Sequence, residues 1–544
     1  MRRKIITSIL SFLYSIFMMI GISFQKNGSF SWLTKNIVVK LLIFFLFIIV
    51  FYLIINFLFK LIDNKKQKND SKLSKWKFIF DSHPFIFSFC FIILCWLIYI
   101  IAFYPLIMSY DPSYQILQYF HIDNKYSYYS VLLDNDVIIT NHHPVIHTLL
   151  LGSLAKLGLN LFNQINIGLF FYSLIQITVL ATTLAYTISY MKKQNISIKY
   201  RIITLIIYGI VPVFPFYAIS PVKDVIFGCL VIFYIILFYE CLTSKEKINI
   251  KKILLFLIIM ILLMLFRNNG IHLIILSFPV LLLFKSQNKK SYIILFVLIL
   301  GFYTSYTKII LPSFKITPSS IRETLSIPFQ QTARYVSYHD ELVTKEEQDI
   351  IDKILDYNTL KERYNPEKSD PVKNKFNRFS TKEDLKKYFE VWFKQFKNKP
   401  VCYLEATVNN TYGYIYPLKT NWYIYHKYNS TLEKNGLDYH YNNLSNLRSI
   451  LSTWGEIFPY IPIIGLIVNI GFNNWLLLFL LFYLIDRKKY RELFYLLPSC
   501  ILTLVCFASP VNTYFRYALP NVFATPVLLT IFNQIITKKS QKQL

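Results

Sequence analysis

Long apolar runs separated by short basic clusters are the feature that most restricts what this chain can fold into. A helix of about 20 apolar residues crosses the hydrocarbon core of a bilayer, and many runs here are close to that length. Of the 544 residues, 54% are hydrophobic and only 16% are charged, which is too apolar for a soluble globular protein. The sequence therefore predicts an all-α polytopic membrane protein.

The basic clusters predict how the chain is threaded through the membrane. Lys and Arg residues collect in cytoplasmic loops, so the net charge of +28 is interpreted as topology and not as a nucleic-acid surface. This rule gives roughly twelve spans with both termini in the cytoplasm, the first being a retained span and not a cleaved signal peptide. The expected spans are 5–24, 37–62, 85–103, 167–190, 202–219, 225–242, 253–266, 271–284, 292–311, 457–485, 493–508 and 519–536.

Four parts of the chain follow from this topology. Residues 1–84 form an N-terminal transmembrane pair with a basic cytoplasmic loop, and 85–311 form a transmembrane core whose first external loop is 105–164. Residues 312–455 form a mainly helical extracytoplasmic domain, and 456–544 form the C-terminal transmembrane helices.

Three local patterns give more detailed expectations. The first external loop should hold two short interfacial helices, with Asn141 capping the second and Pro144 in its first turn. A helical period covers 345–360. The stretch 457–485 is one span or two half-helices, and the basic residues that follow it favour one crossing.

Asp111 is the first candidate for chemistry, because it follows the third span and lies between Pro105 and Pro112. A carboxylate at a membrane exit is either a functional group or a residue that caps a helix. The topology collects further polar residues on the same face of the membrane, which indicates a site. These residues are Asp111, His142, His143, His147, Lys223, Asp224, Arg267, Arg334 and Arg516.

Two of the histidines have the spacing of metal ligands. His143 and His147 are four residues apart and would share a helix face, where Asp111 or Asp224 could complete a metal site. Histidine serves equally well as a hydrogen-bond donor to a phosphate or a sugar. No cofactor is therefore predicted with certainty, and a divalent metal is the alternative. Lys223 and Asp224 could form a mutually neutralising ion pair.

The chain contains four short motifs, Ser109-Tyr-Asp111 with Gln115 and Gln118, Asn141-His-His-Pro144, Pro221-Val-Lys-Asp224, and Arg516-Tyr-Ala-Leu-Pro520. Together they resemble motifs of the GT-C membrane glycosyltransferases. The chain is similar to the protein O-mannosyltransferase and aminoarabinose transferase branch, over residues 85–267 and the Arg516 region. It resembles most an uncharacterised group of bacterial multi-pass proteins that carry the Pro328–Arg334 stretch Pro-Phe-Gln-Gln-Thr-Ala-Arg.

The resemblance implies a GT-C-like core at 85–311 that transfers a sugar from a polyprenyl-phosphate carrier, with inversion. The acceptor would be a polymer, lipid or protein of the cell envelope, and the active site would be extracytoplasmic. Asp111 would be the general base, its pKa raised by partial desolvation, with Asp224 as a second catalytic residue. Lys223, Arg267, Arg334 and Arg516 would bind the donor phosphate. The predicted substrate-binding residues are Gln115, Asn141, His142, His143 and His147.

The chain departs from the mannosyltransferase pattern in its first loop. Those enzymes carry an acidic pair there, whereas here Asp111 is followed by Pro112. Two other functions stay open, namely a transporter or flippase and a polymerase or ligase of lipid-linked polysaccharide precursors. A transporter should show internal repeats and charges near the midplane of the bilayer. We find no such repeat, and the polar residues gather at one surface.

Overall fold

The computed structural model describes residues 1–64, 75–124, 139–421, 423–509 and 511–537. These residues form helices joined by loops, with isolated bridges and no strand among them. Most of the predicted basic loop after the second span, and the middle of the first external loop, lie outside the described residues.

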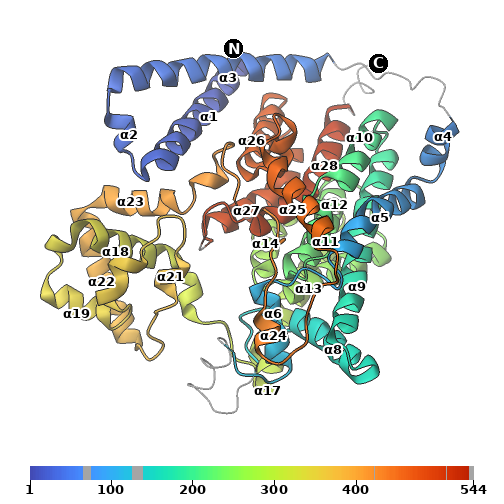
Figure 1. The fold of residues 1–544 in the computed structure, drawn as a ribbon. Coiled ribbons are helices and arrows are strands. Elements are labelled where there is room, and N and C mark those ends of the chain that lie inside the picture. Colours follow the sequence, from blue (N-terminus) through green and yellow to red (C-terminus); the bar gives the residue numbers. More distant parts are fainter. Residues whose placement is uncertain (65–74, 125–138, 422, 510, 538–544) are drawn as a thin grey trace.

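The helices come in three groups along the chain (Figure 1). The first group is α1 (Arg2–Asn27), α2 (Ser31–Thr34), α3 (Ile37–Asp63), α4 (Lys75–Ser82), α5 (Pro84–Ala102), α6 (Tyr110–Tyr119), α8 (Val145–Phe162), α9 (Ile165–Lys193), α10 (Ile198–Ile210), α11 (Val213–Ala218), α12 (Lys223–Thr243), α13 (Ile250–Phe266), α14 (Gly270–Ser277), α15 (Val280–Leu283), α16 (Lys289–Ser305), η1 (Tyr306–Ile310) and α17 (Leu311–Ser313). The second group is η2 (Ile321–Thr324), α18 (Ser326–His339), η3 (Asp340–Leu342), α19 (Lys345–Asp352), η4 (Tyr357–Thr359), α20 (Leu360–Arg363), α21 (Asp370–Lys373), α22 (Lys382–Asn398), α23 (Pro400–Asn409), η5 (Tyr412–Tyr414) and α24 (Thr431–Lys434). The third group is α25 (Ser445–Ile457), η6 (Phe458–Tyr460), η7 (Ile464–Val468), α26 (Ile470–Asp486), η8 (Glu492–Leu496), α27 (Leu497–Phe507) and α28 (Phe515–Thr537).

The lengths and compositions of these helices are those of a polytopic membrane protein. Among the described residues, eight helices are long and apolar enough to cross a bilayer. They are α1, α3, α5, α8, α9, α12, the continuous segment Lys289–Ser313, and α28. Shorter apolar helices cover Gly270–Leu283, Ile470–Asp486 and Glu492–Phe507. The α-helical class is thus confirmed, whereas the twelve expected spans are not.

Prolines explain where the expected spans differ from the helices observed. Proline has no N–H group and interrupts the helical hydrogen bonds. Pro212 separates α10 from α11 within the expected span 202–219, and Pro279 separates α14 from α15 within 271–284. In 457–485 only α26 is a continuous helix, because α25 ends at Ile457 and two 3₁₀ turns follow. Conversely α8, expected to be interfacial, is long enough to span.

Ion pairs show which helix ends lie together. At one end of the bundle Arg3 of α1 contacts Asp63 of α3 at 2.6 Å and Asp486 of α26 at 2.7 Å. At the other end, the side chain of Asn409 in α23 donates to the carbonyl oxygen of Gly28, just after α1. Next to Asn409, the side chain of Asn410 donates to the carbonyl oxygen of Ser509, shortly before α28 begins. The N-termini of α12 and α28 and the C-terminus of α13 meet one another there. The candidate residues on these helices therefore share one end of the bundle.

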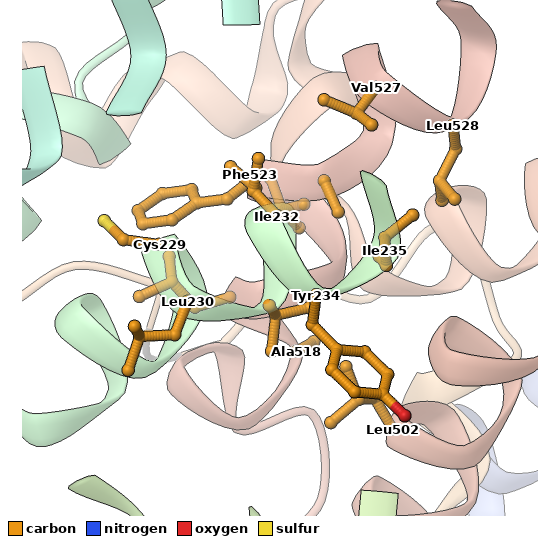
Figure 2. Close-up of a cluster of buried hydrophobic side chains, with 14 of the residues drawn as sticks. Cys229, Leu230, Ile232, Tyr234, Ile235, Leu502, Ala518, Phe523, Val527 and Leu528 are labelled. Carbon is orange, nitrogen blue, oxygen red and sulfur yellow. The ribbon is translucent and has the colours of Figure 1, made fainter. Parts of the chain in front are cut away.

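The centre of the membrane core is the pair α12 and α28. α12 is apolar all round, and a helix of that kind is buried on every side. Figure 2 shows its side chains, including Ile232 and Ile235, packed against Phe523 and Val527 of α28, with Leu502 of α27 nearby. This packing fixes the N-terminal ends of both helices, which carry charged residues.

The predicted domain 312–455 consists of two differently packed parts. From Leu325 to Tyr403 it has its own hydrophobic core, built mainly by α18, α19, α22 and α23 (Figure 1). Capping boxes at Thr344 and Thr381 begin α19 and α22. The helix predicted over 345–360 ends at Asp352. After this part the chain returns to the membrane core, where Tyr439 packs beside α6.

Candidate active site

Asp111 lies in the first turn of α6 and faces a guanidinium from the other end of the chain. Its Oδ2 accepts a hydrogen bond of 2.6 Å from Nη1 of Arg516 at the start of α28. The Asp111 side chain is 24% exposed, so the contact is only partly open to solvent. Ser109 is the N-cap residue of α6. The alternative that Asp111 caps a helix is therefore wrong.

Asp224 supplies a second carboxylate close to the first. It occupies the first turn of α12 and is fully buried. Its Oδ1 lies 3.1 Å from Nη1 of Arg267, and its Oδ2 lies 4.0 Å from Nε of Arg516. Both guanidiniums also lie against the ring of Tyr517, at 5.3 Å from its centroid in each case. A buried carboxylate and an aromatic ring thus hold two like charges together.

His143 and Lys223 complete this group of charges. Nζ of Lys223 lies 3.0 Å from Nδ1 of His143, and Nε2 of His143 lies 4.0 Å from Oδ1 of Asp111. Burial and then the charge of Lys223 hold the pKa of His143 well below its usual value, so the imidazole is neutral. Lys223 therefore donates to Nδ1, and the Nε2 proton faces Asp111.

The expected ion pair between Lys223 and Asp224 is wrong. Lys223 contacts His143, whereas Asp224 contacts Arg267. Neighbouring residues on a helix point about 100° apart, so they do not face each other. We call Asp111, His143, Lys223, Asp224, Arg267 and Arg516 the Asp111 cluster.

The electrostatics of Asp111 differ from the sequence-based expectation. Burial raises the pKa of its carboxyl, but the charges of Arg516 and Lys223 and the hydrogen bond from Arg516 outweigh that effect. The net result is a pKa of Asp111 below its usual range. The prediction of a raised pKa is wrong for this arrangement. Asp111 can act as a base near neutral pH only after Arg516 has moved away.

Gln115 and His147 belong to a buried network behind the Asp111 cluster. Nε2 of His147 is 2.8 Å from the hydroxyl of Tyr172, which donates to Gln176. Nδ1 of His147 is 3.1 Å from the side-chain oxygen of Gln115. Both ring nitrogens of His147 therefore have protein partners, which argues against the metal site expected from its spacing with His143. In the part of the chain that is described, no group of three or more His, Cys, Asp or Glu side chains could hold a metal ion.

Asn141 and His142 connect the cluster to residues 317–409, which we call the outer part of the chain. The backbone N–H of Asn141 donates to the carbonyl oxygen of Thr317 at 2.7 Å. Nδ1 of His142 is 3.8 Å from Oε1 of Glu323. The other carboxylate oxygen of Glu323, Oε2, lies 2.7 Å from Nζ of Lys373. Pro144 is the N-cap residue of α8, so the prediction that Asn141 caps this helix is wrong.

The structure does not bring Arg334 into the Asp111 cluster. Its Nη2 donates to Glu405, and its Nη1 is 3.1 Å from the hydroxyl of Tyr364. Arg334 is only 3% exposed, and both partners lie in the outer part of the chain. The guanidinium holds α18 to α23 in that part.

Two features of the site are not among the residues expected from the sequence. The ring of Tyr517 between Arg267 and Arg516 was missed, although Tyr517 follows Arg516 directly in the chain. The outer residues Glu323 and Lys373 were missed because nothing in their local sequence indicates that Glu323 reaches His142 or that Lys373 pairs with Glu323. The second carboxylate, which the first loop lacks, comes instead from α12.

A mostly apolar cavity of about 490 Å³ lies in the membrane core. Its walls come mainly from α10, α26 and α28, with α28 contributing residues from Val522 to Ile536. Tyr200 and Leu529 line it and are also exposed on the outer surface of the bundle. Arg516 is six residues before Val522, which places the cluster about 9 Å further along the axis of α28.

Comparison with known families covers almost the entire sequence. A family model described as "Family of unknown function (DUF6020)" matches residues 1–543. The chain belongs to the DUF6020 family. No curated protein and no solved structure gives a significant match. The description of DUF6020 assigns no reaction. A function for this chain is therefore inferred from the geometry of the Asp111 cluster.

Proposed function

We propose that this DUF6020 protein is a membrane glycosyltransferase of the GT-C type. It moves a sugar from a polyprenyl-phosphate-linked donor to a polymer, lipid or protein of the cell envelope, with inversion at the anomeric carbon. The observation that carries the proposal is that Asp111 contacts Arg516 and shares one cluster with two further cationic side chains, Lys223 and Arg267, at one end of an apolar helix bundle.

Each part of this reaction has a counterpart in the cluster. The acceptor hydroxyl attacks the anomeric carbon, and its proton passes to a carboxylate oxygen of Asp111. The bond between the anomeric carbon and the phosphate oxygen breaks, and its electron pair stays on that oxygen. Arg267, Arg516 and Lys223 stabilise the charge that develops there.

The charges of the cluster favour an anionic substrate. Three cationic side chains, Lys223, Arg267 and Arg516, accompany two carboxylates. With His143 neutral, the cluster has one positive charge in excess, which a phosphodiester would neutralise. Two arginines suit this role, because a guanidinium binds phosphate oxygens in bidentate geometry.

The apolar cavity supports a donor with a hydrocarbon tail. α28 begins at the cluster and continues along the cavity wall. A phosphate bound by Arg516 would therefore have an apolar cavity further along the same helix. The cavity volume of about 490 Å³ is within the range of about 300–1,000 Å³ for ligand sites.

The remaining site residues take supporting roles in this proposal. Asp224 touches both arginines and positions them, so it acts on the phosphate through them. Asn141, His142 and His143 border the position of the acceptor, whereas Gln115 and His147 keep α6 and α8 in place. Under the positive-inside rule the cluster is extracytoplasmic in the cell membrane, and both termini are cytoplasmic.

Replacement of Asp111 tests the proposal. Asp111→Asn keeps the size of the side chain but cannot take the acceptor proton, so turnover should fall by a factor of about 10² to 10⁴. The assay combines purified full-length protein, polyprenyl-phosphate-linked sugars as donors and cell-envelope fractions as acceptors. Mass spectrometry of these fractions measures the transferred sugar. Asp123→Asn, at an exposed position after α6, is the matched control and should keep full turnover.

Normal turnover by a well-folded Asp111→Asn protein would remove Asp111 from the mechanism. Such a result would favour the flippase or the polymerase and ligase alternatives. A thermal melt of each variant separates loss of chemistry from loss of fold.

A further inference from the structure

We infer that Arg516 is a lock on Asp111 that the donor phosphate opens. While Arg516 binds Asp111, the carboxylate cannot serve as a base, and a phosphate that competes for the guanidinium releases it. The inference rests on the proposed function, because it concerns the regulation of the same site.

The guanidinium of Arg516 contacts Asp111 on one side and Asp224 and two aromatic rings on the other sides. Its Nη1 hydrogen-bonds Oδ2 of Asp111 at 2.6 Å, which is the length of a charge-assisted bond. Its Nε lies 4.0 Å from Asp224, and its face lies over the rings of Tyr514 and Tyr517. Asp224 and the rings can keep Arg516 in the site when the bond to Asp111 breaks. The guanidinium can then turn to an anion without leaving the cluster.

The other groups that face Asp111 cannot replace Arg516. His143 is neutral and 4.0 Å away, and Lys223 is bonded to His143. Two further histidines lie near Asp111: burial lowers the pKa of His142 to about 4, and the ring nitrogens of His147 contact Gln115 and Tyr172, so neither is charged near neutral pH. The other ionisable neighbours are tyrosines, from α6, from the start of α28 and from the segment before α24, and they carry no positive charge. These tyrosines are Tyr114, Tyr425, Tyr514 and Tyr517.

Arg516 is accordingly the largest single influence that lowers the pKa of Asp111. When Arg516 binds a phosphate in place of Asp111, burial becomes the main influence on Asp111. Burial raises the pKa of a carboxyl.

This arrangement imposes an order on the reaction. An acceptor hydroxyl that arrives first meets an Asp111 whose Oδ2 is bonded to Arg516 and whose pKa Arg516 keeps low, so no proton moves. After the donor phosphate has engaged Arg516, the same hydroxyl can pass its proton to Oδ2 of Asp111. The donor thus activates the base that the acceptor needs.

The reactivity of Asp111 toward dicyclohexylcarbodiimide tests the lock without any sugar transfer. This reagent adds to protonated carboxyl groups, and mass spectrometry locates the adduct. Purified full-length protein in detergent micelles is labelled at fixed pH with and without dodecyl phosphate as the probe. The expected result is weak labelling of Asp111 that rises several-fold with the probe, while Asp224 beside Arg267 keeps its labelling.

Variants of Arg516 sharpen the test. Arg516→Gln should give strong labelling of Asp111 that no longer responds to dodecyl phosphate. Arg363→Gln is the matched control, since Arg363 pairs with Asp356 in the outer part, and it should behave as the wild type. If Arg516→Gln does not fold, Arg516→Lys replaces it and should show intermediate labelling that still rises with the probe.

Two results would overturn the lock. One is labelling of the wild-type Asp111 that dodecyl phosphate does not change at any concentration. The other is unchanged labelling in a folded Arg516→Gln protein. Neither readout needs a sugar donor, so a failure of glycosyl transfer with a normal labelling response would refute the proposed function and leave the lock in place.

Discussion

At the residue scale, neighbours from distant parts of the chain decide what each ionisable side chain can do. Asp111 is held ionised by Arg516, which is 405 positions away in the chain. His142 and His143 are adjacent in sequence, yet one faces Glu323 of the outer part and the other faces Lys223 of α12. The residue types could be picked out from the sequence, but their pKa shifts could not.

His142 should make stability depend on pH. Burial lowers the pKa of His142 from 6.5 to about 4, so between these values the unfolded chain binds a proton that the folded protein does not. Stability from this group is fully present above about pH 6.5 and is lost as the pH falls toward 4. One pKa unit corresponds to about 1.4 kcal/mol, so the difference between 6.5 and about 4 limits the loss to about 3.5 kcal/mol.

Melting curves from pH 7 to 4 measure this effect. The wild type should lose melting temperature on acidification more steeply than His142→Asn, and His121→Asn on the exposed turn after α6 is the control. Equal slopes for all three proteins would mean that His142 is not buried in its neutral form.

Arg334 should affect stability and not donor use. Arg334→Gln leaves Glu405 without its buried guanidinium partner, and breaking a buried pair costs about 3 kcal/mol. The melting temperature should fall, while the KM for the donor in the folded fraction should stay unchanged. A raised donor KM with unchanged melting would restore the role in phosphate binding predicted from the sequence.

At the scale of elements, helices end where prolines and close contacts require it. Pro212 and Pro279 divide apolar stretches that hydropathy alone presents as continuous. α8 and α9 form a tight hairpin in which Gly158 faces Gly168, and a Cβ on either residue would lie within 2.3 Å of backbone atoms of the other helix. This contact brings Tyr172 to His147, and so supports the network behind the cluster.

The hairpin gives a prediction with a matched control. Gly168→Ala would place a Cβ 2.1 Å from the carbonyl oxygen of Leu154, which is backbone and cannot turn aside. Overpacking of this kind costs about 1–3 kcal/mol, so the melting temperature should drop. Gly301→Ala has nothing within 4 Å of its Cβ and should melt like the wild type. Identical melting of the two variants would show that α8 and α9 pack less closely.

At the scale of the whole molecule, the fold separates two ends with different chemistry. One end carries Arg3 paired with Asp63 and Asp486, together with the ion pair of Arg201 and Asp81. The other end carries the Asp111 cluster and the outer part of the chain. The basic clusters of the sequence predict that the first end is cytoplasmic.

Cysteine labelling tests this orientation. In a background without the native cysteines, Asp123→Cys should react with a membrane-impermeant maleimide added outside intact cells. Lys247→Cys, on the exposed loop between α12 and α13, should react only after the membrane is opened. Labelling of position 123 only from the cytoplasmic side would exclude an extracytoplasmic active site.

The sequence by itself determined the helical membrane class, because runs of apolar residues can satisfy their backbone hydrogen bonds in a bilayer only as helices. It also singled out Asp111, His143, Lys223, Asp224, Arg267 and Arg516, which the structure brings together through contacts between distant segments. Which charges pair was decided only by the tertiary structure. A helix fixes the direction of a side chain but not its partner, and the packing of α12 against α28 turned Asp224 toward the arginines and away from Lys223. The place of Arg334 was likewise decided by packing, since its guanidinium found a carboxylate within the outer core.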